Sequence, residues 1–139
     1  MDKSERISRL EDASLEAANN GLKALLLLNG GASIAILAFL AQMLGKEGGA
    51  PEFAFLVREM LHSLGFFSAG AGAAVFVTFF AYYANQQYVA ALLAPEKVSW
   101  NRGAILNILG GIIALLSLGL FGVGVQRIWA AVGLWSVNY

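Results

Sequence analysis

Three long stretches without a charged residue constrain this chain more than any other feature of its sequence. Residues 24 to 45, 60 to 95 and 103 to 126 contain no Asp, Glu, Lys or Arg. A helix of about 20 mainly apolar residues crosses a hydrocarbon core roughly 30 Å thick, and each stretch is long enough to do so. The helices of a small soluble domain would carry charges every few residues on their outer faces. The stretches therefore predict an all-α, polytopic membrane protein with three transmembrane helices.

The composition narrows the classes of chemistry that the chain can support. Of its 139 residues 58% are hydrophobic and 13% are charged, against roughly 25% charged in soluble domains. The absence of cysteine excludes disulfides, thiolate catalysis and cysteine metal sites. The net charge is zero and no basic run is present, so nucleic acid is not an expected partner. The expected partners are the lipid bilayer and either further copies of the chain or other membrane subunits.

The tripeptide Asn29-Gly30-Gly31 lies inside the first stretch and is compatible with a turn or a helix. Asn-Gly between apolar flanks is a strong hairpin signal in soluble proteins. At membrane depth, however, a turn would leave backbone groups without hydrogen bonds at several kcal/mol each. Glycine is also common in membrane helices. We therefore expect the helix to continue through all three residues.

The stretches and the charges around them divide a single domain, residues 1–139, into segments. We expect a cytoplasmic helical extension (1–21), a first span (22–44), a loop and an interfacial segment or helical lead-in (45–62), a second span (63–84), a helix end and loop (85–102), a third span (103–125) and an aromatic interfacial tail (126–139). The extension is interpreted as a solvated helix at the membrane surface, with self-association as the alternative. Because Tyr and Trp concentrate at membrane interfaces, the expected anchors are Tyr82, Tyr83, Trp129 and Trp135.

The distribution of basic residues predicts the orientation in the membrane. The N-terminal side and the second loop carry Lys3, Arg6, Arg9, Lys23, Lys97 and Arg102, whereas Lys46, Arg58 and Arg127 lie on the other side. Cytoplasmic loops carry an excess of Lys and Arg. We therefore expect a cytoplasmic N-terminus and a C-terminus outside.

Uncharged polar side chains occur in or beside each span. With the expected orientation Asn29, Asn85, Gln86 and Asn107 all fall in the cytoplasmic third of the bilayer. Amide side chains inside a membrane form hydrogen bonds between helices, so one interpretation is an interhelical polar clasp. The other interpretation is an uncharged polar constriction that lines a pore, or a ligand site, on the cytoplasmic side.

Small residues form a second pattern in the spans. The expected packing positions are Gly30, Gly31, Ser68, Gly70, Gly72, Gly110, Ala114 and Ser117, and Gly103 and Gly124 extend the same face of the third span. Small residues let helix backbones approach closely in membranes. These faces offer more packing surface than three helices need among themselves, which favours self-assembly or docking into a larger complex.

The sequence carries no recognisable catalytic or cofactor motif, and the spans hold no ionisable side chain of the kind that membrane enzymes and proton pumps place there. One histidine, His62, cannot complete a metal or haem site within one chain. We expect no enzymatic activity, no cofactor and no metal. Copies of His62 brought together in a symmetric oligomer are the alternative.

The runs "LLLLNGGASIAILAFLAQ" (25–42) and "AYYANQQYVAAL" (81–92) resemble small uncharacterised bacterial inner-membrane proteins with an LNGGA-type first span and an AYxxNQ-type second span. The resemblance implies a bacterial inner-membrane location. It carries no activity, so no site residue follows from it.

Together these features predict a non-enzymatic membrane protein that self-assembles into a homo-oligomeric pore or channel-like complex. The alternative is an accessory or structural subunit that packs against the transmembrane helices of a larger membrane complex.

Overall fold

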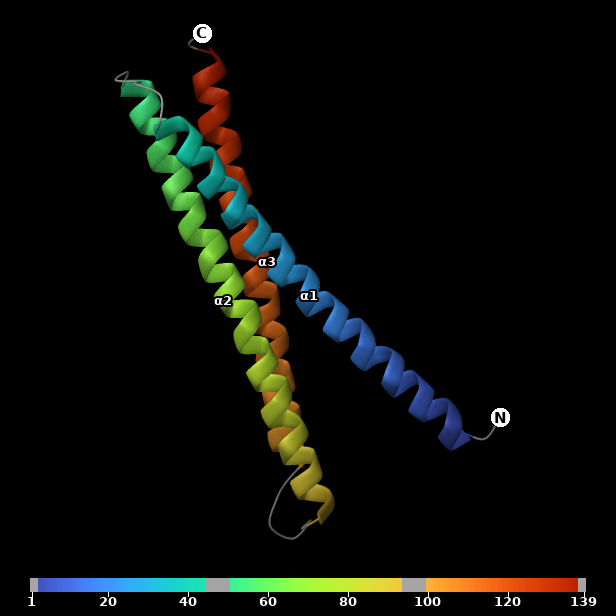
Figure 1. Ribbon diagram of the computed structural model, residues 1–139. Helices are drawn as coiled ribbons and strands as arrows, with labels where there is room; N and C mark the ends of the chain where they lie inside the picture. Colours follow the sequence, from blue (N-terminus) through green and yellow to red (C-terminus); the bar gives the residue numbers. More distant parts are fainter. Residues whose placement is uncertain (1–2, 45–50, 94–99, 138–139) are drawn as a thin grey trace.

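A computed structural model describes residues 3–44, 51–93 and 100–137, which form three long helices (Figure 1). These are α1 (Lys3–Leu44), α2 (Pro51–Leu93) and α3 (Trp100–Val137). Each helix is long and apolar enough to cross a membrane. The expected all-α fold with three spans is confirmed. The chain is an integral membrane protein whose spans contact the lipid bilayer.

The helices extend beyond the stretches that cross the bilayer. They contain 42, 43 and 38 residues, which gives lengths of roughly 57 to 65 Å, about twice the thickness of a hydrocarbon core. Residues 51–62 are the first turns of α2, so this part of the chain is the helical lead-in rather than a separate segment. Residues 126–137 continue α3 in the same way. The expected loops at 45–50 and 94–99 lie outside the described residues.

Helix α1 is continuous through Asn29, Gly30 and Gly31. No residue in the described parts of the chain has a positive φ, which a tight Asn-Gly hairpin would require. The helical interpretation of this tripeptide is correct. The membrane environment accounts for it, because a helix satisfies its backbone hydrogen bonds internally.

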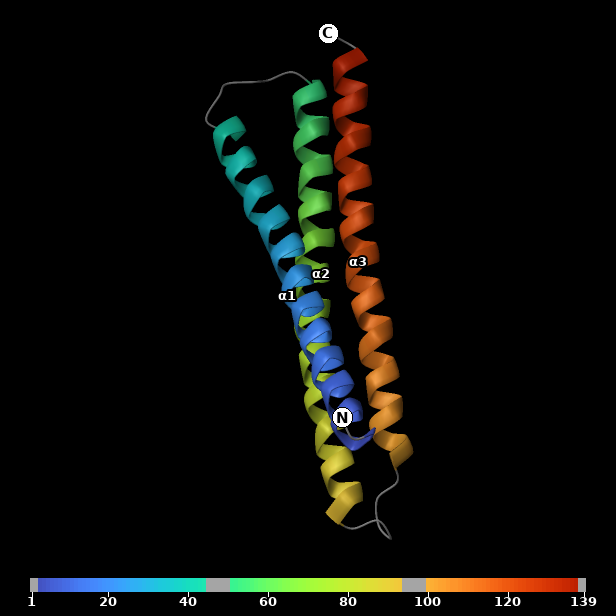
Figure 2. The ribbon, with the colours of Figure 1, turned by 90° about the vertical axis from the view of Figure 1, so that its right-hand side faces the viewer.

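The three helices are arranged as an antiparallel pair with a third helix across it. Helices α2 and α3 lie side by side along most of their length (Figures 1 and 2). Helix α1 packs mainly on α2 and has few contacts with α3. Its C-terminal half lies against the pair, while its N-terminal half diverges from both helices (Figure 1).

A seven-residue repeat of small residues forms the α3 side of the contact with α2. The buried positions of α3 are Gly103, Gly110, Ser117, Gly124 and Ala131, and those of α2 alternate in steps of three and four through much of the helix. A repeat of 3.5 residues per turn is typical of left-handed packing between helices. The glycines admit rings from α2: a Cβ at Gly124 would lie 2.6 Å from the Phe67 ring, and one at Gly103 2.5 Å from the Tyr88 ring.

The attachment of α1 rests on an apolar core near its C-terminal end. Ile36 and Leu40 of α1 are buried in one cluster with Leu56, Met60 and Phe67 of α2, and α3 contributes Ala131. Large apolar side chains elsewhere, such as Leu27 at 75% exposure, face outward. In a bilayer these side chains contact lipid, so the exposed apolar surface is consistent with membrane insertion.

The seven-residue repeat predicts that Gly124→Ala destabilises the fold and that Gly122→Ala does not. The new methyl group at position 124 meets the Phe67 ring, whereas a Cβ at Gly122 has no neighbour within 4 Å. We expect a loss of about 1 to 3 kcal/mol for Gly124→Ala, in the range of overpacked cores. Unfolding by SDS in mixed micelles, followed by tryptophan fluorescence, measures both variants. Equal unfolding midpoints would show that the close approach at Gly124 is not needed.

Candidate functional site

A polar cluster joins all three helices near the middle of the bundle, and we call Asn29, Gly70 and Ser117 the polar node. The side chains of Asn29 and Ser117 are fully buried, and Gly70 is buried beside them. The Asn29 Nδ2 group donates to Ser117 Oγ at 3.3 Å and to the Leu25 carbonyl of its own helix at 3.1 Å. Ser117 Oγ in turn donates to the Gly70 carbonyl at 2.8 Å. This chain of hydrogen bonds runs from α1 through α3 to α2.

The remaining polar atom of the node, Asn29 Oδ1, has no conventional hydrogen-bond donor. It lies 2.2 Å from the point where a Cβ on Gly70 would stand. In glycine that point is close to the position of an α-hydrogen, so Oδ1 faces a Cα–H group of α2. Such contacts contribute perhaps 0.5 to 1 kcal/mol. Glycine is therefore required at position 70 by the direct approach of the amide.

The charged groups of α2 and α3 indicate the depth of the polar node. Arg127 Nη1 donates to Glu59 Oε2 at 3.1 Å, and ionisable side chains belong at or outside the edge of the hydrocarbon core. Gly70 and Ser117 are roughly 15 to 16 Å along their helices from this pair, which is half the thickness of the core. The node therefore lies about half the thickness of a hydrocarbon core from this ion pair.

The other amide side chains lie elsewhere. Asn107 Nδ2 donates to the Tyr88 hydroxyl at 3.3 Å and links α3 to α2, roughly 15 Å along α3 from Ser117. The side chains of Asn85 and Gln86 are exposed. Within one chain, therefore, the four amide side chains do not form a single cluster. Sequence reasoning assigned Ser117 to packing and missed its hydroxyl as the partner of Asn29, although the two fall in different spans at compatible depths.

The predicted packing positions divide between internal contacts and exposed faces. Gly70, Gly110 and Ser117 are buried between helices, and Ala114 is half-buried. Ser68 and Gly31 are exposed, and an added Cβ at Gly30, Gly31 or Gly72 would meet nothing within 4 Å. Among the predicted anchors, Tyr82, Tyr83 and Trp129 are exposed, as an interfacial side chain would be. The side chain of Trp135 is not among those that the structure describes.

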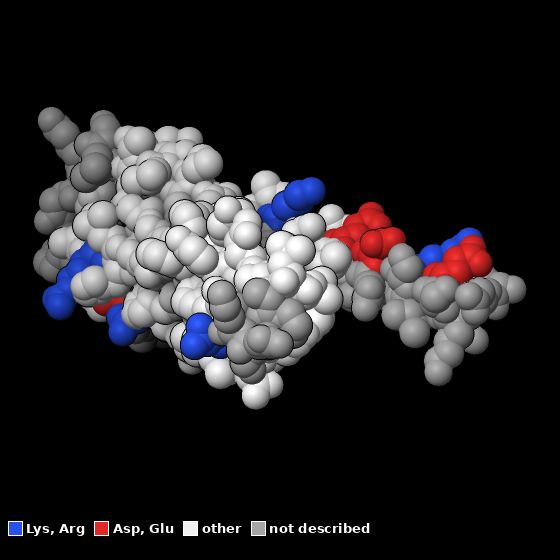
Figure 3. All heavy atoms as spheres, turned by 90° about the horizontal axis from the view of Figure 1, so that it is seen from below, with Lys and Arg blue, Asp and Glu red and all other residues white. Residues whose placement is uncertain are grey.

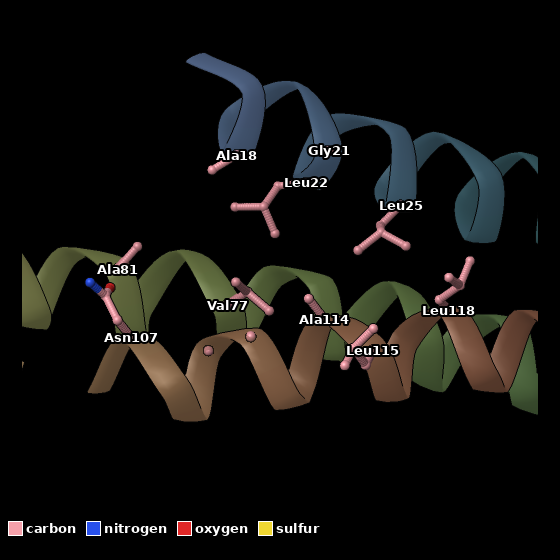
Figure 4. A pocket seen from close by; sticks show the side chains of 12 residues that line it. Ala18, Gly21, Leu22, Leu25, Val77, Ala81, Asn107, Ala114, Leu115 and Leu118 are labelled. Carbon is pink, nitrogen blue, oxygen red and sulfur yellow. The ribbon is translucent and has the colours of Figure 1, made fainter. Parts of the chain in front are cut away.

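An apolar groove opens where α1 diverges from the other helices. It has a volume of roughly 520 Å³. Leu22 and Leu25 of α1 point across it toward α2 and α3 (Figure 4). Its opposite wall includes three small residues of α3, namely Gly110, Gly111 and Ala114, together with larger residues of α2 and α3. The lining of the groove suits an apolar ligand or another helix.

A second hollow lies beside the Glu59–Arg127 ion pair. It has a volume of roughly 490 Å³ and is lined by His62, Gly65, Phe66, Ala69, Leu120 and Arg127, with Leu61. The Arg127 guanidinium lies 5.5 Å from the centre of the Phe66 ring. His62 Nδ1 is 3.6 Å from Glu59 Oε1. Within the described residues no three His, Asp or Glu side chains gather as a metal site would require.

The chain matches no family model, and no curated protein or solved structure is significantly similar to it. The features of the molecule that bear on its function are therefore the polar node, the groove and the charged residues around them.

The polar node predicts that Asn29→Leu and Ser117→Ala have effects on stability that are not additive. Leucine has nearly the shape of asparagine but cannot donate to Ser117. Each single substitution should cost about 1 to 2 kcal/mol, near the upper range for hydrogen bonds between membrane helices. The double variant should cost less than their sum, because both remove the same bond.

Unfolding in SDS and mixed micelles measures all four proteins of this cycle. Ser68→Ala is the matched control, because Ser68 is an exposed serine of α2. Strictly additive effects would mean that Asn29 and Ser117 are not coupled.

Proposed function

We propose that the protein is a non-enzymatic membrane protein that self-associates in the bilayer through the groove beside α1. The observation that carries this proposal is the groove itself, an apolar concavity with a floor of Gly110, Gly111 and Ala114. Hydrocarbon gives no hydrophobic driving force between helices, so association depends on close packing, and small residues permit it. Because α1 diverges, it leaves part of the surface of α2 and α3 without a neighbouring helix. A helix from a second copy would pack there.

The charges beyond the groove favour a second copy as the occupant. The diverging end of α1 carries the exposed acidic residues Asp12 and Glu16, and acidic groups gather on this projecting arm (Figure 3). Arg102 is exposed near the start of α3. Among the side chains that the structure describes, none of these three forms an ion pair.

The depths of these groups also match. Helices α1 and α3 run in the same direction, and Asp12, Glu16 and Arg102 each lie roughly 20 to 26 Å from the polar node along their helices. A second α1 placed parallel in the groove would bring its acidic residues to the level of Arg102. Two copies could exchange this contact reciprocally, as a two-fold dimer does.

Conduction through the assembly is the second candidate function. Its support is the exposure of Asn85 and Gln86 on α2, with Asn107 exposed near the same end of the bundle. Uncharged amides can form a polar constriction around a shared axis. Asn29 is enclosed in the polar node and is not available as a lining residue in this arrangement. An accessory subunit of a larger complex would use the same groove for a foreign helix.

The setting that we propose is a bacterial inner membrane with the N-terminus in the cytoplasm. The basic residues support this orientation, because Arg9, Lys23 and Arg102 lie toward one end of the bundle and Arg58 and Arg127 toward the other. The orientation would place Asn85 and Gln86 at the cytoplasmic side.

Self-association through the groove predicts that Gly111→Leu lowers the oligomer yield, whereas Gly119→Leu leaves it unchanged. Both glycines are exposed on α3, and a Cβ at either would meet nothing within 4 Å, so both variants should fold. Only Gly111 lines the groove. Native mass spectrometry after mild detergent extraction measures the assembly. Equal oligomer yields would rule out the groove, and stoichiometric foreign subunits in place of a multimer would favour the accessory function.

Conduction predicts ion flux through the purified protein in liposomes, and a changed flux in Asn85→Leu or Gln86→Leu. The physical reason is that each substitution removes an exposed amide from the proposed constriction. Val89→Ala, an exposed apolar position on α2, is the control. If no flux occurs over a range of lipids and membrane potentials, the conduction proposal fails while self-association stands.

A further inference from the structure

The hollow beside Arg127 has the features of a site for one phospholipid molecule. Its polar rim is formed by Arg127 and His62, and its floor continues over Gly65 and Ala69 between the helices. Gly65 and Ala69 lie one helical turn apart on α2, below the level of Glu59 in the direction of the polar node. The hollow therefore begins at the edge of the hydrocarbon core and extends into it.

The rim is suited to an anion. Arg127 directs Nη1 to Glu59, but a guanidinium has five N–H donors. The remaining donors can contact oxygen atoms that approach from the headgroup region. Arg58 is exposed beside Glu59 and adds a second positive charge. Among the described side chains at this end of α2 and α3, Arg58, Arg127 and Glu59 together carry a net positive charge.

The position of Arg127 is fixed before any ligand binds. Glu59 accepts a hydrogen bond from one edge of the guanidinium, and the centre of the Phe66 ring lies 5.5 Å from its central carbon. Arginine is the residue best suited to bind phosphate with two parallel hydrogen bonds. An arginine that is already oriented loses less side-chain entropy on binding.

The floor is suited to an acyl chain. A Cβ at Gly65 would meet nothing within 4 Å, and Ala69 is exposed, so these two small residues leave a channel along α2. Leu120 of α3 and Phe66 of α2 form its apolar walls. The volume of roughly 490 Å³ is large enough for part of one lipid chain.

We propose that this hollow binds an anionic phospholipid, with the phosphate on Arg127 and one acyl chain over Gly65 and Ala69. The site is separate from the groove beside α1, so it does not depend on self-association. A lipid bound here would contact α2 and α3 together.

The test is lipid retention by the full-length protein in native mass spectrometry, with dioleoyl phosphatidylglycerol and dioleoyl phosphatidylcholine as probes. The wild type should retain one phosphatidylglycerol in preference to phosphatidylcholine. Arg127→Gln should lower this retention at least about tenfold, the effect of losing charge-assisted hydrogen bonds. Gly65→Leu should lower it similarly by filling the channel.

Two matched variants control the test. Lys23→Gln removes an exposed basic side chain of α1 toward the other end of the bundle, and Gly72→Leu adds the same side chain to an exposed, uncontacted glycine of α2. Both should retain lipid as the wild type does. Circular dichroism establishes that each variant is folded. If Arg127→Gln does not fold, Gly65→Leu still tests the site, because it retains the Glu59–Arg127 ion pair.

Three outcomes would overturn the proposal. The first is unchanged phosphatidylglycerol retention in Gly65→Leu, which would exclude the acyl channel. The second is equal retention of the two lipids, which would exclude recognition of the negative charge. The third is displacement of the lipid by inorganic phosphate alone at millimolar concentration, which would indicate a simple anion site.

Discussion

The close approach of α2 and α3 is the constraint on which the rest of the structure depends. In hydrocarbon an apolar side chain gains nothing by leaving lipid for another helix, so packing contacts and hydrogen bonds must hold the bundle together. The seven-residue repeat of small residues on α3 supplies these contacts by admitting the Phe67 and Tyr88 rings at Gly124 and Gly103. The α2–α3 pair formed in this way is the surface on which α1 rests. The core around Ile36 and Leu40 attaches α1 at one end only.

The polar node gives this arrangement a unique register. A shift of α1 along α2 by one helical turn would disturb the apolar core around Ile36 and Leu40 and would also break the polar node. Such a shift would separate Asn29 from Ser117 and place its amide in hydrocarbon, where an unpaired polar group is costly. The Gly70 α-hydrogen leaves room for the amide, so the same glycine serves both packing and register.

The membrane fold could be predicted from the sequence, because long apolar stretches without charged residues cross a bilayer as helices. The helix through Asn29 followed from the same argument. The small-residue face of the third span was also recognisable, since its members share one helical spacing. On α2, however, Ser68 and Gly72 form as good a pattern as Gly70 and Ala74, although Ser68 and Gly72 are exposed and Gly70 and Ala74 are buried. The choice between them depends on where α3 lies.

The site was less predictable for a related reason. Sequence reasoning grouped Asn29 with Asn107 by counting from the expected membrane boundary. In the structure Asn29 pairs with Ser117, whereas Asn107 pairs with Tyr88. A position counted along each span does not show which polar side chains face each other. The groove and the hollow beside Arg127 could not be foreseen, because both exist only where helices diverge or where a small residue leaves a gap between them.

The polar node also has a consequence for biosynthesis. Asn29 enters the membrane on the first helix, but Ser117 is on the last, so the hydrogen bond between them cannot form until all three helices have been inserted. Until then the side-chain amide of Asn29 lacks its partner on α3 and is costly to keep among lipid chains. Insertion of α3 therefore gives the buried amide of Asn29 its hydrogen-bond partner. An incompletely inserted product therefore keeps an amide in the bilayer without its partner on α3, which the fully inserted protein does not.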